Sequence, residues 1–372
     1  MDLPMKTDTG LLKTGVIKKR ELYFDVLWVF AMLFQIFAYS EGKDAYELCA
    51  FGSMSYRFCL FMTVFSRFSL WLCLMISGAV LLEKEESIKK VWSGRISRVV
   101  IILLVSSFGY YMLDVIKGRE EFDLARFLID IYSRERLIQF WYLYAYIGFL
   151  VCLPFLRPLV KNMRNADFIY LIAAVFVLSS ILPLIDAKVL LGRYCLNPSM
   201  KLDWLSAELF IYPVLGYYFH NRVKLRECRV LAPVLAILDI IWMLYNTFVM
   251  ETTGTSAGSV EMYPSYHGRC VMLHCITLFV CAKALFHGRE KNNLHRTIGS
   301  LGGCSLGIYL LGPLFLDGRV DLFENLRLTL RGDAEGVVVL WAAFVWSVIV
   351  YCICFVPTWL VRRIPGLKKV TT

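Results

Sequence analysis

Charged residues are scarce in this sequence. Asp, Glu, Lys and Arg make up only 19% of the 372 residues, whereas soluble domains contain about 25%. The twelve cysteines are scattered, with no Cys-x-x-Cys pair and no Cys/His cluster of zinc spacing. There is also no phosphate-binding glycine loop and no nucleophile elbow. The sequence therefore predicts no metal site and none of the common soluble-enzyme sites, and we expect the cysteines to act as small apolar residues.

Long apolar runs dominate instead. Hydrophobic residues make up 58% of the chain, and a helix that spans a bilayer needs about 20 mostly apolar residues. The runs do not alternate as barrel strands do. We therefore predict an all-α integral membrane protein, a bundle of about ten transmembrane helices. The ten runs are 22–40, 58–82, 99–116, 138–156, 168–185, 204–220, 230–250, 270–286, 298–316 and 336–361.

The charges between these runs predict the orientation, because cytoplasmic loops collect Lys and Arg. With a cytoplasmic N-terminus, the inner segments hold 24 Lys and Arg and the outer segments hold 14. We expect both termini in the cytoplasm and a multi-pass protein of the cell (inner or plasma) membrane. On this interpretation, the net charge of +10 reflects the orientation of the chain in the membrane. A nucleic-acid partner is not expected, because that role needs a clustered basic face on a soluble domain.

Three segments follow from this layout. Residues 1–21 form a cytoplasmic N-terminal segment, 22–361 form the transmembrane domain, and 362–372 form a cytoplasmic basic tail. The first 20 residues are polar and basic without an apolar core, so we do not expect a cleavable signal peptide.

Several ionisable residues fall inside the predicted spans, where such residues are costly and usually face the bundle interior. Arg67 lies deep in its run and needs acceptors, which Glu208 or Asp239 could supply. A structural ion pair and a functional role both remain possible for these residues. Lys283 is close enough to a span end to reach the inner surface. The full set is Asp25, Arg67, Asp114, Glu208, Asp239 and Lys283.

Five segments resemble acyltransferase family 3, a family of integral membrane O-acyltransferases that modify surface polysaccharides. In that family, an R-x-x-R pair opens the third span after an S-G-x-x-L ending, and Arg95 and Arg98 fit this pair. The resemblance covers nearly the whole chain, in the family's order. The segments are DVLWVFA at 25–31, FSRFSLWLCLMISGAVLL at 65–82, GRISRVV at 94–100, FWYLYAYIGFLVCLPFLRPLV at 140–160 and SLGIYLLGPLF at 305–315.

This resemblance implies transfer of an acetyl or other short acyl group from cytoplasmic acyl-CoA to a hydroxyl of a cell-surface glycan or lipid-linked sugar. Acyl-CoA, with acetyl-CoA expected, is then a co-substrate, and the lipid bilayer and the glycan acceptor are the partners. Arg95 and Arg98 would meet the CoA phosphates at the cytoplasmic mouth, since the guanidinium fork suits phosphate. We expect Arg98 to matter more than Arg95, which is nearer the loop. Alternatively, both are ordinary positive-inside anchors.

The first span departs from the family pattern. The family usually has Arg and, eleven residues later, His, and those positions hold Trp28 and Tyr39 here. Eleven residues make about three helical turns, roughly 16 Å along one face. Trp28 is then a donor-side residue and Tyr39 an acceptor-side one. The last motif has Gly312 where the family often has His.

The sequence therefore leaves the identity of the catalytic base undecided. Histidine is the natural base for a hydroxyl, and His267 is the one histidine on the predicted outer side, with Glu251 or Asp114 expected nearby. Tyr39 and His267 are the two candidates for an O-acyltransferase with an altered base. The alternative is a catalytically degenerate relative that binds or moves an acyl-CoA or a glycan lipid. An unrelated transporter is disfavoured, because the chain shows no inverted repeat.

Overall fold

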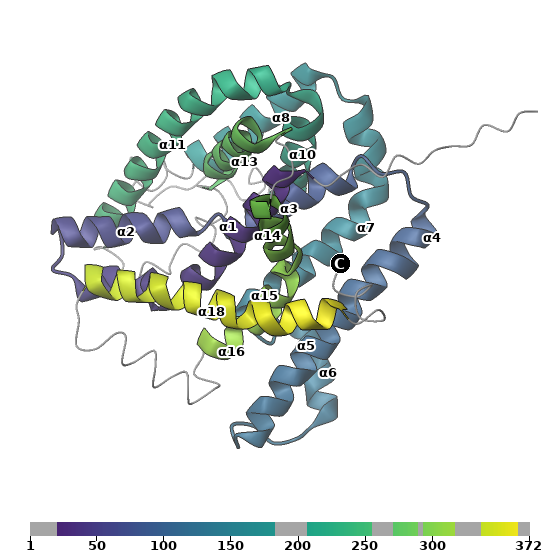
Figure 1. Ribbon diagram of the computed structural model, residues 1–372, viewed down its shortest axis with the longest axis vertical. Helices are drawn as coiled ribbons and strands as arrows, with labels where there is room; N and C mark the ends of the chain where they lie inside the picture. Colours follow the sequence, from purple (N-terminus) through teal and green to yellow (C-terminus); the bar gives the residue numbers. More distant parts are fainter. Residues whose placement is uncertain (1–20, 183–206, 255–270, 289–292, 317–335, 364–372) are drawn as a thin grey trace, which may run out of the picture.

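The computed structural model describes residues 21–182, 207–254, 271–288, 293–316 and 336–363. These residues form helices and turns without a β-strand, which confirms the predicted all-α class. Helix α1 (Leu22–Ala38) lies in the interior, and helices from both halves of the chain pack against it (Figure 1). This central position follows from its sequence, because α1 is apolar nearly throughout and no face is left for water.

The helices of the first half are α1, η1 (Glu41–Leu48), α2 (Met54–Ser66), α3 (Ser69–Leu81), α4 (Ile88–Lys90), η2 (Val91–Ile96), α5 (Ser97–Ile116), α6 (Leu124–Ser133), η3 (Ile138–Phe140), α7 (Trp141–Asn162), α8 (Asn165–Phe176) and η4 (Val177–Ile181). Those of the second half are α10 (Ala207–Tyr217), η7 (Tyr218–Arg222), α11 (Leu225–Gly254), α13 (Met272–Phe286), α14 (Asn293–Gly303), α15 (Ser305–Leu311), α16 (Pro313–Leu316) and α18 (Val337–Arg363).

Five helical segments in the described part of the chain are long and apolar enough to cross a membrane, and a sixth forms if the pair Asn293–Gly303 and Ser305–Leu316, bent by 45°, is one span. Three further apolar helices, α1, α8 and α13, are shorter. The chain is thus a helical membrane protein, but the predicted ten spans are not confirmed. The five long segments are Met54–Leu81, Ile88–Ile116, Ile138–Asn162, Leu225–Thr252 and Val337–Arg363.

Glycines let several helices touch backbone to backbone. A Cβ atom on Gly78 of α3 would collide with the backbone of Pro213, and one on Gly216 of α10 would collide with the backbone of Met75. The same holds in the stretch 299–307, where Gly302 lies against the backbone of Asp25 in α1. The small residues of 299–307 thus permit close helix packing.

Hydrogen bonds and ion pairs between segments that are far apart in the sequence lie at two ends of the bundle. At one end, here called the rim end, Arg157 of α7 binds Glu86 in the loop 82–87, and Arg222 of η7 donates to the carbonyl of Lys161 at 3.0 Å. At the other end, here called the far end, Arg57 of α2 pairs with Glu251 of α11 at 3.0 Å. Helix α1 runs from the rim end, at Leu22, to the far end, at Ala38.

Candidate functional site

A cavity of about 640 Å³ opens at the rim end of the bundle. It is lined by parts of α1, α3, α5, α7, η7, α14 and α15, so segments from both halves of the chain build it. Exposed Glu83 and Lys84 of the loop 82–87 border its opening. Its size falls within the range of about 300–1,000 Å³ that is usual for small-molecule sites.

One side of the opening is held by a carboxylate that binds two arginines. Glu86 accepts two hydrogen bonds from Arg95, both at 2.8 Å, and one from Arg157 at 2.9 Å. Arg157 also donates to the carbonyl of Leu81 at 3.2 Å, which fixes the end of α3. The hydrogen bonds from Arg95, followed by those from Arg157, lower the pKa of Glu86 to about 2. Arg95 and Arg157 thus share one carboxylate, and the cavity lining adds Lys84 together with the carboxylates of Glu21 and Glu83.

The inner part of the cavity is aromatic and apolar. Trp28 and Met32 of α1 face Tyr142 and Tyr146 of α7, and Tyr309 of α15 completes the wall. The ring of Tyr142 lies 5.8 Å from that of Tyr146 and 5.7 Å from that of Tyr309, which are distances of direct ring contact. The cavity thus combines charged groups at its opening with an apolar inner part.

The structure places two of the three predicted donor-side residues on this cavity. Arg95 and Trp28 line it, whereas Arg98, one turn further along α5, is half-buried beside it and is not among its lining residues. That Arg98 matters more than Arg95 stays a prediction. Arg95 belongs to the π-helical turn η2 and binds Glu86.

Tyr39 lies apart from this cavity, at the far end of α1. Its hydroxyl accepts a hydrogen bond from the indole N–H of Trp141 at 3.2 Å, and the charged side chains that act on it are Arg67 and Glu135. Tyr39 is not among the residues that line the cavity, whereas Tyr309 is.

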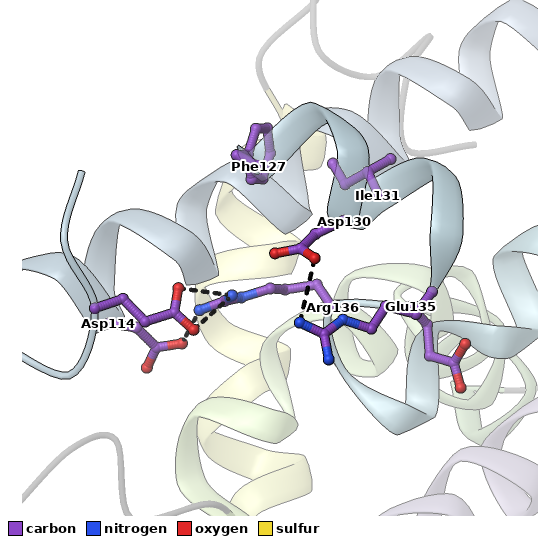
Figure 2. Close-up of a pocket in the computed structure, with 8 residues that line it drawn as sticks. Asp114, Phe127, Asp130, Ile131, Glu135 and Arg136 are labelled. Atoms are coloured by element: carbon purple, nitrogen blue, oxygen red, sulfur yellow. Dashed lines mark hydrogen bonds and ion pairs between the residues drawn. The ribbon is translucent and has the colours of Figure 1, made fainter. Parts of the chain in front are cut away.

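The carboxylates expected beside His267 have other partners. His267 itself lies outside the described residues. Glu251 pairs with Arg57, as described above. Asp114 pairs with Arg136 at 2.5 Å, and this pair borders a second hollow of about 260 Å³ between α5 and α6 (Figure 2). Glu135 borders the same hollow, and its side chain points away from that ion pair (Figure 2).

Asp239, one of the two acceptors suggested for Arg67, has a histidine as its partner. The Asp239 carboxylate lies 2.6 Å from Nδ1 of His274, and the two side chains are 6% and 3% exposed. The reason is that α11 packs against α13, which carries His274. Arg67 ends α2 at the junction with α3, close to Tyr39. The side chain of Glu208 lies outside the described part of the chain, so its proposed pairing with Arg67 stays a prediction.

Sequence reasoning missed several residues of this site: Glu86, His220 and Arg157 at the rim, and the three tyrosines of the inner part. A signal for Arg157 was present, since it is a lone cation among apolar residues in 140–160. Glu86 stands among other charged residues, so the loop composition alone does not distinguish it. His220 joins the cavity only through tertiary packing.

The family model of the acyltransferase 3 domain matches residues 22–363 of the chain. No curated protein and no solved structure matches it significantly. The matched range includes every described helix, and the resemblance drawn from the five sequence segments is thereby confirmed. The chain belongs to the acyltransferase 3 family, and it is a membrane acyltransferase in the general sense of that family.

Proposed function

We propose that this protein transfers an acetyl or other short acyl group from cytoplasmic acyl-CoA to a hydroxyl of a cell-surface glycan or lipid-linked sugar. The observation that carries the proposal is the cavity at the rim end, because its two parts suit the two parts of an acyl-CoA. The phosphates would meet Arg95 at the opening, and the slender acyl-pantetheine arm would enter the apolar part beside Trp28.

The rim can bind phosphate because its arginines are held in place before the ligand arrives. Glu86 fixes the guanidinium plane of Arg95, and Arg157 fixes Glu86. A pre-positioned guanidinium loses less conformational entropy on binding than a free side chain. Lys84 on the same border adds a further cation. Arg95 is thus more than a membrane anchor in this proposal.

The acceptor would react at the inner end of the cavity. Tyr39 caps the C-terminal end of α1, the helix that carries Trp28. Its hydroxyl already accepts from Trp141, so its own proton can be directed to an acceptor oxygen. In this proposal Tyr39 orients the attacking hydroxyl in this way, and it takes the proton of that hydroxyl only as the phenolate. His267 is the second candidate for the base.

The proposed topology is ten crossings with both termini in the cytoplasm of a cell whose inner or plasma membrane holds the protein. Alternation of the loops between two ends supports it, since loops 82–87 and 161–164 meet at the rim end and η1 and Glu251 lie at the far end. The rim end would then face the cytoplasm, where acyl-CoA is found.

The test uses purified full-length protein in nanodiscs with labelled acetyl-CoA, and it measures CoA release and labelled lipid or glycan product. Arg95→Ala should weaken CoA binding about ten- to a hundredfold, because a hydrogen bond to a charged group contributes about 1.5–3 kcal/mol. Arg164→Ala is the matched control, since this arginine is exposed and pairs only with Asp167 of its own helix turn. Equal CoA binding by the wild type and both variants would contradict the donor site.

A second function, binding without catalysis, is favoured by one observation. Tyr39 is not among the residues that line the cavity, and the histidine among them, His220, is bound through Nδ1 to Tyr23. Tyr39→Phe separates the two functions. If Tyr39 acts in catalysis, the variant should lose about 10²–10⁴-fold in turnover while CoA binding is kept. A protein that binds CoA but shows no wild-type turnover with any glycan acceptor is the binding relative.

A further inference from the structure

His220 lines the same cavity, and the proposed function gives it no role. It belongs to the short π-helical turn η7 at the rim end. Its neighbours on the cavity wall are Phe24 of α1, whose ring lies 5.1 Å away, and Trp28 one turn further in. Arg95 and Lys84 line the same cavity from other segments. His220 is therefore an imidazole on the wall of a cavity that also carries these two cations.

A buried lysine holds the backbone that carries His220. The ammonium group of Lys283, in α13, donates to the carbonyls of Phe219 at 2.7 Å, His220 at 2.9 Å and Val223 at 2.7 Å. Lys283 is only 3% exposed, so it does not reach the surface as its position near a span end suggested. Burying an ammonium group is expensive unless all its protons are bound, and three carbonyls meet that need here. The turn with His220 is thus held firmly.

A buried tyrosine orients the imidazole ring. The hydroxyl of Tyr23 is hydrogen-bonded to Nδ1 of His220, and Tyr23 is fully buried in contact with Phe279. This contact directs the opposite ring nitrogen, Nε2, away from Tyr23. Fixing one imidazole nitrogen by a hydrogen bond is a common way of presenting the other to a ligand. Two elements far apart in the sequence therefore position this one side chain.

We propose that His220 is a donor-binding residue that contacts a phosphate-bearing group of the acyl donor through Nε2, with Tyr23 as its positioning residue. This inference rests on the proposed function, since it deepens the donor site. An imidazole that donates to a phosphate oxygen complements the guanidinium of Arg95. The carboxylate of Glu21 also lines the cavity and lies 3.3 Å from Nδ1 of His287.

The test compares two probes on the full-length protein in nanodiscs, namely CoA and pantetheine, which lacks the nucleotide phosphates. His220→Asn is the main variant, because the short amide reaches the position of Nδ1 and can keep the Tyr23 contact while Nε2 is removed. It should weaken CoA binding about tenfold or more and leave pantetheine binding unchanged. Tyr23→Phe should weaken CoA binding less, with the same selectivity. Arg164→Ala, the exposed arginine that pairs with Asp167, is the control and should change neither affinity.

The outcomes are distinct. Unchanged CoA affinity in His220→Asn, while Arg95→Ala still weakens it, overturns the inference and leaves the proposed function standing. An equal loss for CoA and pantetheine also overturns it, because the residue would then shape the cavity without contacting phosphate. A wild type that binds neither probe removes both the donor site and this inference. If His220→Asn does not fold, the selectivity of Tyr23→Phe decides.

Discussion

Glu86 joins two arginines from different helices with one carboxylate, and this makes the rim sensitive to acid. Its pKa of about 2 lies below the ordinary value of 4.5. Its contribution to stability is therefore complete above about pH 4.5 and is lost as the pH falls toward 2. We expect the wild type to lose stability relative to Glu86→Gln across this window, by at most about 1.4 kcal/mol per pH unit. Thermal unfolding of both proteins between pH 2 and 7 measures this, and parallel curves would contradict it.

The buried pair of Asp239 and His274 allows a second prediction at this scale. His274→Ala leaves a carboxylate that is 6% exposed without its partner, and breaking such a pair costs about 3–5 kcal/mol. The variant should therefore unfold at a clearly lower temperature in detergent. The double variant Asp239→Leu with His274→Met should recover most of the loss, because both polar groups are then gone. A double variant as unstable as His274→Ala would contradict this account.

These residues also show what sequence can and cannot predict. That Asp239 needs a buried partner follows from its apolar surroundings alone. Which partner it has depends on the packing of α11 against α13, and sequence does not supply that neighbourhood. Trp28 and Arg95 were predicted through the family resemblance and do line one cavity. Their exact contacts, such as Arg95 with Glu86, come from the loop geometry.

At the scale of helices, the contact between α3 and α10 depends on two glycines. Gly216→Ala would place a methyl group against the backbone of Met75, and backbone cannot move aside as a side chain can. We expect a loss of about 1–3 kcal/mol or more. Gly109→Ala in α5 is the matched control, because nothing lies within 4 Å of its added Cβ. It should be neutral or stabilising by about 0.5–1 kcal/mol. Unfolding in detergent compares the two, and equal effects would contradict the role of the contact.

The helical elements were predictable where apolar runs are long. The run 99–116 is contained in the continuous segment Ile88–Ile116, and 336–361 matches α18. The breaks were not predictable from composition. Phe68 and Arg67 separate α2 from α3, and Cys304 separates α14 from α15, because helix ends there depend on tertiary contacts. Gly303, for example, lies against the guanidinium of Arg362 from α18.

At the scale of the whole molecule, the donor cavity and Tyr39 stand at opposite ends of α1. An enzyme that moves an acyl group from a cytoplasmic donor to an outer acceptor needs such an arrangement. The cavity extends from the rim end to Tyr309, and Tyr39 caps the opposite end of α1. The acyl group alone would then have to pass from one end toward the other. The large donor and the large acceptor would each stay on its own side.

This arrangement of donor cavity and Tyr39 requires the rim end to face the cytoplasm. The last prediction is therefore the orientation of the protein in the membrane. The Lys and Arg bias of 24 to 14 places the C-terminus inside and residues 251–269 outside. Alkaline phosphatase, which is active only after export, is fused after residue 372 in one protein and inserted at 255–270 in another. We expect activity from the insertion and none from the terminal fusion. A green fluorescent protein fused at the same two places should give the opposite pattern. Phosphatase activity at the terminus with a silent insertion would reverse the orientation, and the cavity would then open away from its acyl-CoA.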